Sequence, residues 1–288
     1  MKYLLSILFS SIIFSLSAQD NSKVTVFSLI KNGEDISISN PLAVPHGKGY
    51  NNQPSFISNE KILIASFHLE QIDILSFDVK TGEKARFEFP LGGDQFSPQL
   101  IPDSEEFATV RLDTSGIQRL YKYSMKNKEA SPLLDDISVA YFAFYDQNEI
   151  LATVLNEEKM DLVRIDLNSR KTDTLFHDAG RFIQKIPGTD TMSYTLVNPS
   201  NKMDIYGMDM STGESYFITE LSKGVLDGVW IDDSRILMGI GHNLYLFDTF
   251  GEGEWEHFAS LEDHGISGIT RMAISPDGKS LAIVSNQP

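Results

Sequence analysis

The chain contains no cysteine. This absence excludes disulfide bonds, cysteine-based metal sites, a thiol nucleophile and a lipid-modified N-terminal cysteine. Any fold of this chain must therefore be stable without covalent cross-links.

Positive charge is also scarce, with 24 Lys and Arg against 40 Asp and Glu and a formal net charge of −16 at pH 7. Nucleic acids and anionic membranes bind surfaces where Lys and Arg cluster, so neither is an expected partner. The content of aromatic and aliphatic residues is ordinary for a packed globular protein, which argues against disorder.

A short apolar run is found at the N-terminus. Residues 1–19 combine one basic residue, a short apolar core and small residues near the end, a pattern typical of a secretory signal peptide. A membrane anchor is the alternative, but a spanning helix needs about 20 apolar residues. We predict a signal peptide over 1–19 and a domain over 20–288 that is periplasmic or secreted and does not insert into the membrane.

Several catalytic motifs are missing. The sequence has no Gly-x-Ser-x-Gly elbow, no glycine-rich phosphate loop, no His-Glu-x-x-His pair and no calcium-loop spacing. We interpret the Asp135-Asp136 and Asp232-Asp233 pairs as solvated turns. The histidines are expected at the surface or as hydrogen-bonded core residues; they are His46, His68, His177, His242, His257 and His264. No catalytic residue, metal ligand or cofactor is predicted from these motifs.

Two patterns repeat along the chain. The polar turn at 78–83 recurs at 209–214 and, in weaker form, at 166–171, 124–129 and 29–34. A second pattern, a strand that runs into a turn, recurs in steps of 41 to 45 residues; its equivalent positions are Phe56, Leu100, Phe144, Lys185, Trp230 and Ile274. Each unit holds four strand-like runs, and repeats of 40–45 residues with four strands are typical of propeller blades.

These units predict a six-bladed β-propeller. Five complete blades are expected at 50–93, 94–138, 139–180, 181–225 and 226–266. Residues 20–49 carry only two outer strands and 267–288 only two inner strands, so we expect the chain ends to pair in one composite blade and close the ring. Two β-sandwiches are the alternative, but sandwiches need no matched half-blades at the ends.

The C-terminal segment carries a family resemblance. Ser275-Pro276-Asp277-Gly278 predicts a tight turn before a strand over 281–284. The whole segment 274–286 resembles the WD-like repeat of TolB-type propellers, which are bacterial periplasmic proteins, and 96–103 and 203–209 resemble parts of the same repeat. The resemblance implies an all-β propeller of six four-stranded antiparallel blades.

The resemblance does not carry a function. TolB has an α/β domain before its propeller and the prolyl-oligopeptidase relatives have a hydrolase domain after theirs, and neither is expected here. Thus neither the Tol–Pal role nor peptidase activity is implied. Six-bladed lactonases and sugar dehydrogenases assemble their ligands from different blades, so spacing in the sequence leaves a metal such as calcium open.

Channel-lining residues are expected from the first strand of each blade. One residue of each blade lies three positions before the equivalent position of the repeated turn. These residues are Gln53, Ser97, Tyr141, Phe182, Asp227 and Arg271. Of these, we predict Gln53, Ser97, Tyr141, Asp227 and Arg271 as a ligand- or partner-binding set at the channel mouth. Arg271 would bind a carboxylate or phosphate and Tyr141 would stack or donate a hydrogen bond. An ion pair between Asp227 and Arg271 is the competing explanation for these two residues.

The function expected from the sequence is that of a TolB-like, non-enzymatic binding module of the bacterial envelope, acting as a monomer on an envelope protein or a glycan. The alternative is a propeller enzyme of the lactonase or sugar-dehydrogenase type, with a metal or cofactor in the channel.

Overall fold

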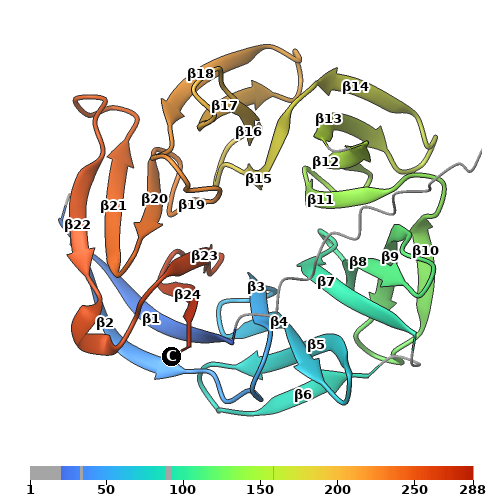
Figure 1. Ribbon diagram of the computed structural model, residues 1–288, viewed down its shortest axis with the longest axis horizontal. Coiled ribbons are helices and arrows are strands. Elements are labelled where there is room, and N and C mark those ends of the chain that lie inside the picture. Colours follow the sequence, from blue (N-terminus) through green and yellow to red (C-terminus); the bar gives the residue numbers. More distant parts are fainter. Residues whose placement is uncertain (1–20, 33–34, 89–91, 158, 288) are drawn as a thin grey trace, which may run out of the picture.

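The computed structural model describes residues 21–32, 35–88, 92–157 and 159–287. Within them, six four-stranded antiparallel sheets form a ring (Figure 1). The predicted all-β six-bladed propeller is therefore confirmed. The predicted signal peptide, residues 1–19, lies outside the described residues.

Each sheet is one blade. The five blades formed by consecutive strands are β3 (Asn51–Phe56), β4 (Lys61–His68), β5 (Gln71–Asp78) and β6 (Lys84–Phe87); β7 (Gly93–Leu100), β8 (Glu106–Asp113), β9 (Gln118–Ser124) and β10 (Ala130–Leu134); β11 (Val139–Phe144), β12 (Glu149–Asn156), β13 (Lys159–Asp166) and β14 (Thr172–Phe176); β15 (Ala179–Lys185), β16 (Thr191–Val197), β17 (Met203–Asp209) and β18 (Ser215–Glu220); and β19 (Val229–Trp230), β20 (Arg235–Ile240), β21 (Asn243–Asp248) and β22 (Glu256–Ser260). One short 3₁₀ helix, Glu262–His264, follows the last of these. Among the described residues, no helix has the length and apolar character needed to cross a membrane.

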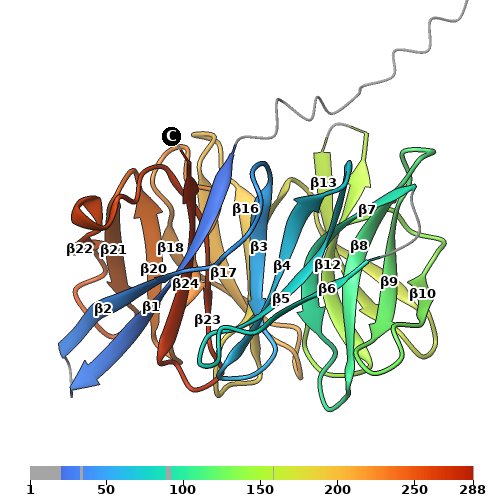
Figure 2. The ribbon, with the colours of Figure 1, turned by 90° about the horizontal axis from the view of Figure 1, so that it is seen from below.

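The sixth sheet combines strands from both ends of the described chain. Its order is β2 (Asp35–Ala43), β1 (Ser22–Asn32), β24 (Ser280–Asn286) and β23 (Ile269–Ile274). β1 and β24 pair antiparallel from Ser22 opposite Asn286 to Ser28 opposite Ser280. Figure 2 shows the two strands side by side in the flat ring. This pairing brings β23 to the inner edge of the ring, beside β3 and β19.

Apolar packing holds each blade against its neighbours. Six clusters of buried side chains occur, and each joins two adjacent sheets. For example, Val24 and Val284 of the composite sheet pack with Ile64 of β4, while Phe27 and Ile283 pack on the blade that contains β20. Burial of such side chains provides most of the favourable free energy of folding. The inner strands are thereby fixed relative to one another around the whole ring.

The repeated polar turn has a single physical cause. The Asp78 carboxylate accepts hydrogen bonds from the backbone N–H groups of Lys80 and Thr81, and Gly82 then adopts a positive φ of 76°. Asp209 caps the turn before Gly213 in the same way. Aspartate bonds its own backbone two residues on, and glycine accepts positive φ at no steric cost. The sequence repeat is thus a repeat of the turn between the third and fourth strands.

One sequence interpretation is wrong. Asp232 does not lie in a solvated turn, because its carboxylate forms ion pairs with Lys31 at 3.0 Å and with Arg235 at 2.6 Å. Burial alone would raise the pKa of Asp232, but hydrogen bonds from Arg235 and Lys31 outweigh this effect and lower the pKa to about 2. Lys31 belongs to β1, so this cluster ties the composite sheet to the neighbouring blade.

Because the chain has no native cysteine, the pairing of its two ends can be tested with an engineered disulfide. Lys23 lies opposite Ser285 in the β1–β24 ladder, where Cα atoms of antiparallel partners are close enough for a disulfide. We expect the Lys23→Cys/Ser285→Cys variant to lose both free thiols on mild oxidation and to unfold at a higher urea concentration. A Lys23→Cys/Lys279→Cys control should stay reduced. Persistent free thiols in the first variant would contradict the register.

Asp232→Asn should lower the free energy of unfolding by about 1–2 kcal/mol at pH 7, since the folded-state pKa of Asp232 is depressed. This contribution is present above about pH 4 and is lost as the pH falls toward 2, so the two proteins should converge in stability there. Urea unfolding across pH measures the difference. The matched control is Asp233→Asn, at the adjacent exposed position, which should stay within about 0.5 kcal/mol at every pH. Equal costs for both changes would refute the assignment.

Candidate functional site

The inner strand of several blades is irregular near the residues that are predicted to line the channel. In β3 and β7 the pairing register shifts around Gln53 and Ser97, and β11, β15 and β23 shift as well. Gln53 and Ser97 have positive φ values of 54° and 49°. A bulge redirects side chains, and a non-glycine residue in this region stores on the order of 1–3 kcal/mol that the surrounding structure must offset. Such strain points to a candidate site at this level.

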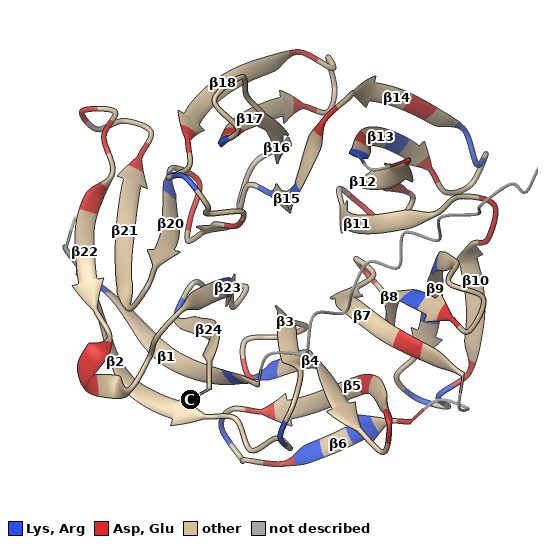
Figure 3. Ribbon diagram, in the orientation of Figure 1, with Lys and Arg blue, Asp and Glu red and all other residues tan. Residues whose placement is uncertain are grey.

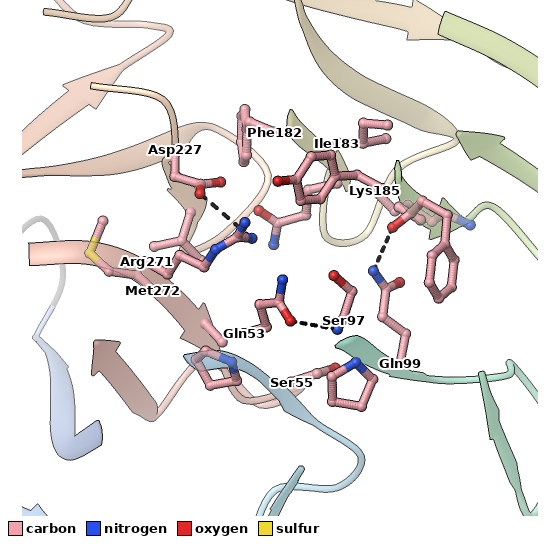
Figure 4. Close-up of a pocket in the computed structure, with 18 of the residues that line it drawn as sticks. Gln53, Ser55, Ser97, Gln99, Phe182, Ile183, Lys185, Asp227, Arg271 and Met272 are labelled. Atoms are coloured by element: carbon pink, nitrogen blue, oxygen red, sulfur yellow. Dashed lines mark hydrogen bonds and ion pairs between the residues drawn. The ribbon is translucent and has the colours of Figure 1, made fainter. Parts of the chain in front are cut away.

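A pocket of about 340 Å³ lies at the centre of the ring, and all six inner strands contribute to its lining (Figure 4). It contains every residue of the predicted binding set: Gln53, Ser97, Tyr141, Asp227 and Arg271. From these positions the lining continues toward the C-terminal ends of β3, β7, β11, β15 and β23. The structure thus brings the five residues together in one pocket, and their role in binding stays a prediction.

Two guanidinium groups meet one carboxylate in this pocket. Nε of Arg181 on β15 lies 2.7 Å from Oδ2 of Asp227, and Nη1 of Arg271 on β23 lies 3.7 Å from the same oxygen. All three side chains are largely buried, with 13% to 24% of their surface exposed. Arg181 also donates a hydrogen bond from Nη2 to the carbonyl oxygen of Thr270, at 3.0 Å. The expected pair of Asp227 and Arg271 is present, but Arg181 makes the shorter contact.

Hydrogen bonding in this cluster is incomplete. The Nε of Arg181 and the Oδ2 of Asp227 are buried and have no hydrogen-bond partner among the described residues, so their 2.7 Å contact is an ion pair without hydrogen-bond alignment. The hydroxyl oxygen of Ser97 is likewise buried without a partner. Buried polar groups are nearly always hydrogen-bonded in native proteins, and unsatisfied ones need an explanation.

Arg271 also reaches across the pocket. Its guanidinium carbon lies 5.3 Å from the ring centroid of Tyr141, which belongs to β11 on the opposite side of the ring. Burial alone would lower the pKa of Arg271, but the nearby carboxylate of Asp227, together with the Tyr141 and Tyr50 phenols, raises it above its ordinary value. Burial raises the pKa of Tyr50 to about 12, so this phenol stays neutral near pH 7. Arg271 therefore keeps its positive charge in the pocket.

Three glutamine side chains are held in fixed orientations. Oε1 of Gln53 accepts a hydrogen bond from the backbone N–H of Ser97 at 2.8 Å, and Oε1 of Gln184 accepts one from the backbone of β19 at 3.1 Å. Nε2 of Gln99 donates to a backbone carbonyl of β11 at 2.6 Å. In each case the bond joins neighbouring blades and occupies one end of the amide. The other end of each amide has no hydrogen-bond partner among the described residues.

The pocket is positively charged although the protein is acidic. Its lining contains Arg181, Lys185 and Arg271 against the single carboxylate of Asp227, a formal balance of +3 − 1 = +2. Figure 3 shows Lys and Arg on β15 and β23, while Asp and Glu are spread over outer strands and turns. The whole chain has a net charge of −16. The basic side chains of the pocket therefore create a local positive potential, which the low-dielectric walls of the pocket strengthen.

Sequence reasoning missed Arg181. The fixed offset of three residues selected Phe182, which also lines the pocket but is only 3% exposed and packs in the core between two blades. The offset fails because β15 has two extra residues between Ala179 and Ile183, whereas β3, β7, β11 and β23 have one extra residue at their register shifts. The sequence did contain a signal, because Arg181 directly precedes two apolar residues. The apolar side chains suit the core, which leaves the charged side chain to face the channel. Gln99 and Gln184 were missed because they lie one position before the repeated turn, whereas only residues three positions before it were considered.

The pocket does not suit calcium. Calcium takes six to eight oxygen ligands, whereas the pocket offers one carboxylate, Asp227, flanked by two guanidinium groups that repel a cation. Across the part of the chain that the structure describes, no three His, Cys, Asp or Glu side chains gather as a possible metal site.

No protein family model matches the chain, and no curated protein matches it either. Among solved structures, a TolB candidate from Agrobacterium tumefaciens is similar at a TM-score of 0.67 and 12% identity, over 93% of this chain and 99% of that one. TolB from Acinetobacter baumannii gives 0.60 at 14% identity, over 91% of this chain and 64% of that one. An oligogalacturonate lyase from Vibrio parahaemolyticus gives 0.53 at 10% identity, over 93% and 98%.

At these identities, the likeness concerns the fold alone. The chain has the TolB-type propeller fold, and the resemblance predicted from the segment 274–286 is confirmed at that level. The same fold carries an enzyme in the Vibrio protein, so the fold does not distinguish a binding module from an enzyme.

The shared carboxylate yields a stability prediction. Asp227→Asn leaves two buried guanidinium groups without a counter-charge and should lower the free energy of unfolding by about 3 kcal/mol. Arg271→Gln should cost less, because Arg181 still balances Asp227. Adding Arg271→Gln to Asp227→Asn should restore at least about 1 kcal/mol, measured by urea unfolding of the four proteins. Strictly additive costs would show that the three charges do not act as one cluster.

Proposed function

We propose that this protein is a non-enzymatic binding module of the bacterial envelope that holds an anionic ligand or partner segment in the central pocket of its propeller. The observation that carries the proposal is the buried cluster of Arg181, Asp227 and Arg271, which gives an acidic protein a positively charged pocket. Guanidinium groups bind carboxylates and phosphates through paired hydrogen bonds.

The form of the pocket supports binding. Its size falls in the range of small-ligand sites, and its polar groups converge on one space from all six blades. The glutamine amides are already oriented, so a ligand would not have to order them, and such preorganisation lowers the free-energy cost of binding. The positive charge of the pocket favours anions over neutral compounds.

The structural neighbours are compatible with this proposal. We expect an envelope protein or a glycan as the partner; the likeness to TolB supports the propeller fold, and an oligogalacturonate lyase of similar fold is named for an acidic saccharide. The predicted signal peptide favours a periplasmic or secreted location. The competing function is a lactonase- or sugar-dehydrogenase-type enzyme.

Photo-crosslinking from the pocket tests the proposal. The amino acid p-benzoylphenylalanine is placed at Ser55, which lines the pocket, and in a control at Ser211, in an exposed outer turn. After irradiation in periplasmic and secreted fractions, intact-mass spectrometry should show adducts at position 55 alone, and Arg271→Gln should remove them.

Adducts of equal yield at both positions, or none at position 55, would contradict a binding pocket. The purified protein is also assayed with lactones and aldoses, with and without added calcium. Turnover of any of these would overturn the non-enzymatic assignment in favour of the enzyme.

A further inference from the structure

We propose that the pocket ligand is a sugar acid, bound through a single carboxylate between Arg271 and Arg181. This inference rests on the proposed function and specifies its ligand class. Three features of the pocket carry it: the charge of the arginine cluster, its unused hydrogen-bonding groups, and the mixture of donors and acceptors around it.

The first feature is the local charge. Arg181 and Arg271 share one carboxylate, so the cluster carries one net positive charge. Lys185 is already engaged, because its Nζ donates to the carbonyl oxygen of Tyr145 at 3.1 Å and lies 4.4 Å from the Tyr145 ring. A monoanion neutralises the arginine cluster, whereas a phosphate dianion would exceed the charge of the cluster and could be balanced only with Lys185, which keeps its charge but is held at Tyr145. A carboxylate is therefore favoured over a phosphate.

The second feature is the loose engagement of the guanidinium groups. Nη1 of Arg271 lies 3.7 Å from Asp227, beyond hydrogen-bond distance, and Nε of Arg181 has no hydrogen bond to any residue that the structure describes. Arg271 therefore retains N–H groups for a second acceptor, and the only hydrogen bond that Arg181 donates to a described residue runs from Nη2 to the carbonyl oxygen of Thr270. A carboxylate has two oxygens that accept such donors in parallel. Asp227 acts as a positioning residue, since it holds both arginines in the pocket before a ligand arrives.

The third feature is the set of uncharged groups around the arginines. Gln53 and Gln184 each retain an N–H₂ group, Gln99 retains a carbonyl oxygen, and the buried hydroxyl of Ser97 has no partner among the described residues. Figure 4 shows the side chain of Gln53 beside Arg271, with Ser97 and Gln99 farther across the same pocket. A ligand that matches this set needs hydroxyl groups, which both donate and accept.

A sugar acid combines these properties in one small molecule. Its carboxylate suits the arginine pair, its ring hydroxyls suit the amides and Ser97, and a pocket of about 340 Å³ is of small-ligand size. An acidic peptide side chain supplies the carboxylate but none of the hydroxyls. The sugar acid is therefore the occupant that the pocket favours, and the peptide is a separate arm of the test.

The test is calorimetric titration of the full protein with D-galacturonate and D-glucuronate. The comparison probes are D-galactose, acetate, inorganic phosphate and a capped Glu-containing tripeptide. A uronate should bind at least about tenfold more tightly than any comparison probe, since charged hydrogen bonds to a carboxylate are lost with galactose. Arg271→Gln should weaken uronate binding by at least about tenfold. The matched control is Arg119→Gln, because Arg119 pairs with Asp113 outside the pocket, and it should leave the affinity unchanged.

A second variant separates recognition of the hydroxyls from attraction of charge. Ser97→Ala removes a hydroxyl that bonds no described residue, so the fold should tolerate the change. It should weaken uronate binding about threefold and leave acetate binding unchanged. Circular dichroism checks that Arg271→Gln is folded, and if it is not, Arg181→Gln replaces it with the same expectation.

The outcomes distinguish this inference from the proposed function. Galactose, phosphate or the tripeptide binding as tightly as a uronate would overturn the sugar-acid assignment. Uronate binding that survives the folded arginine variant would overturn the assigned site. No uronate binding, with clear adducts from position 55, would refute the ligand class and leave the binding module standing. If neither uronate binding nor adducts from position 55 are observed, the sugar-acid assignment and the proposed binding function are both refuted.

Discussion

The arrangement of the pocket depends on one carboxylate shared by two guanidinium groups. Asp227 precedes β19, Arg181 comes from β15 and Arg271 from β23, so the cluster joins three successive blades. Burying one positive charge in excess is unfavourable unless other groups compensate it. The ring of Tyr141, on the opposite side of the pocket, contributes to this compensation through its contact with Arg271. A bound anion would complete it.

The cluster can form only because the six sheets are held in a ring. Arg271 lies on β23, which reaches its place through β24, and β24 pairs with β1 from the other end of the described chain. The apolar clusters between neighbouring blades then fix the distances across the centre. This rigid frame can support the positive φ values of Gln53 and Ser97. It also keeps the glutamine amides oriented, because each is bonded to the backbone of the next blade.

The fold could be predicted from the sequence because its signals are local and repeated. The turns at 78–83 and 209–214 carry an aspartate that accepts backbone hydrogen bonds and a glycine four positions later, and both can be identified in the sequence; the turn at 124–129 uses Ser124 in place of the aspartate. The spacing of these turns gives the number of blades. Most of the candidate site followed from the same spacing, since Gln53, Ser97, Tyr141, Asp227 and Arg271 all line one pocket. Arg181 could not be found in this way, because the shift in β15 changes which residue faces inward. The burial of Asp232 was also hidden, because its partner Lys31 lies 201 residues away in the chain.

The central claim is that the arginine cluster of the pocket receives a carboxylate. A crystal structure of the protein grown with D-galacturonate tests it most directly. We expect the sugar in the pocket, with its carboxylate oxygens within hydrogen-bond distance of Arg271 and Arg181 and a ring hydroxyl on Ser97. A sugar bound elsewhere, or a pocket whose arginines contact only Asp227 at saturating galacturonate, would contradict it.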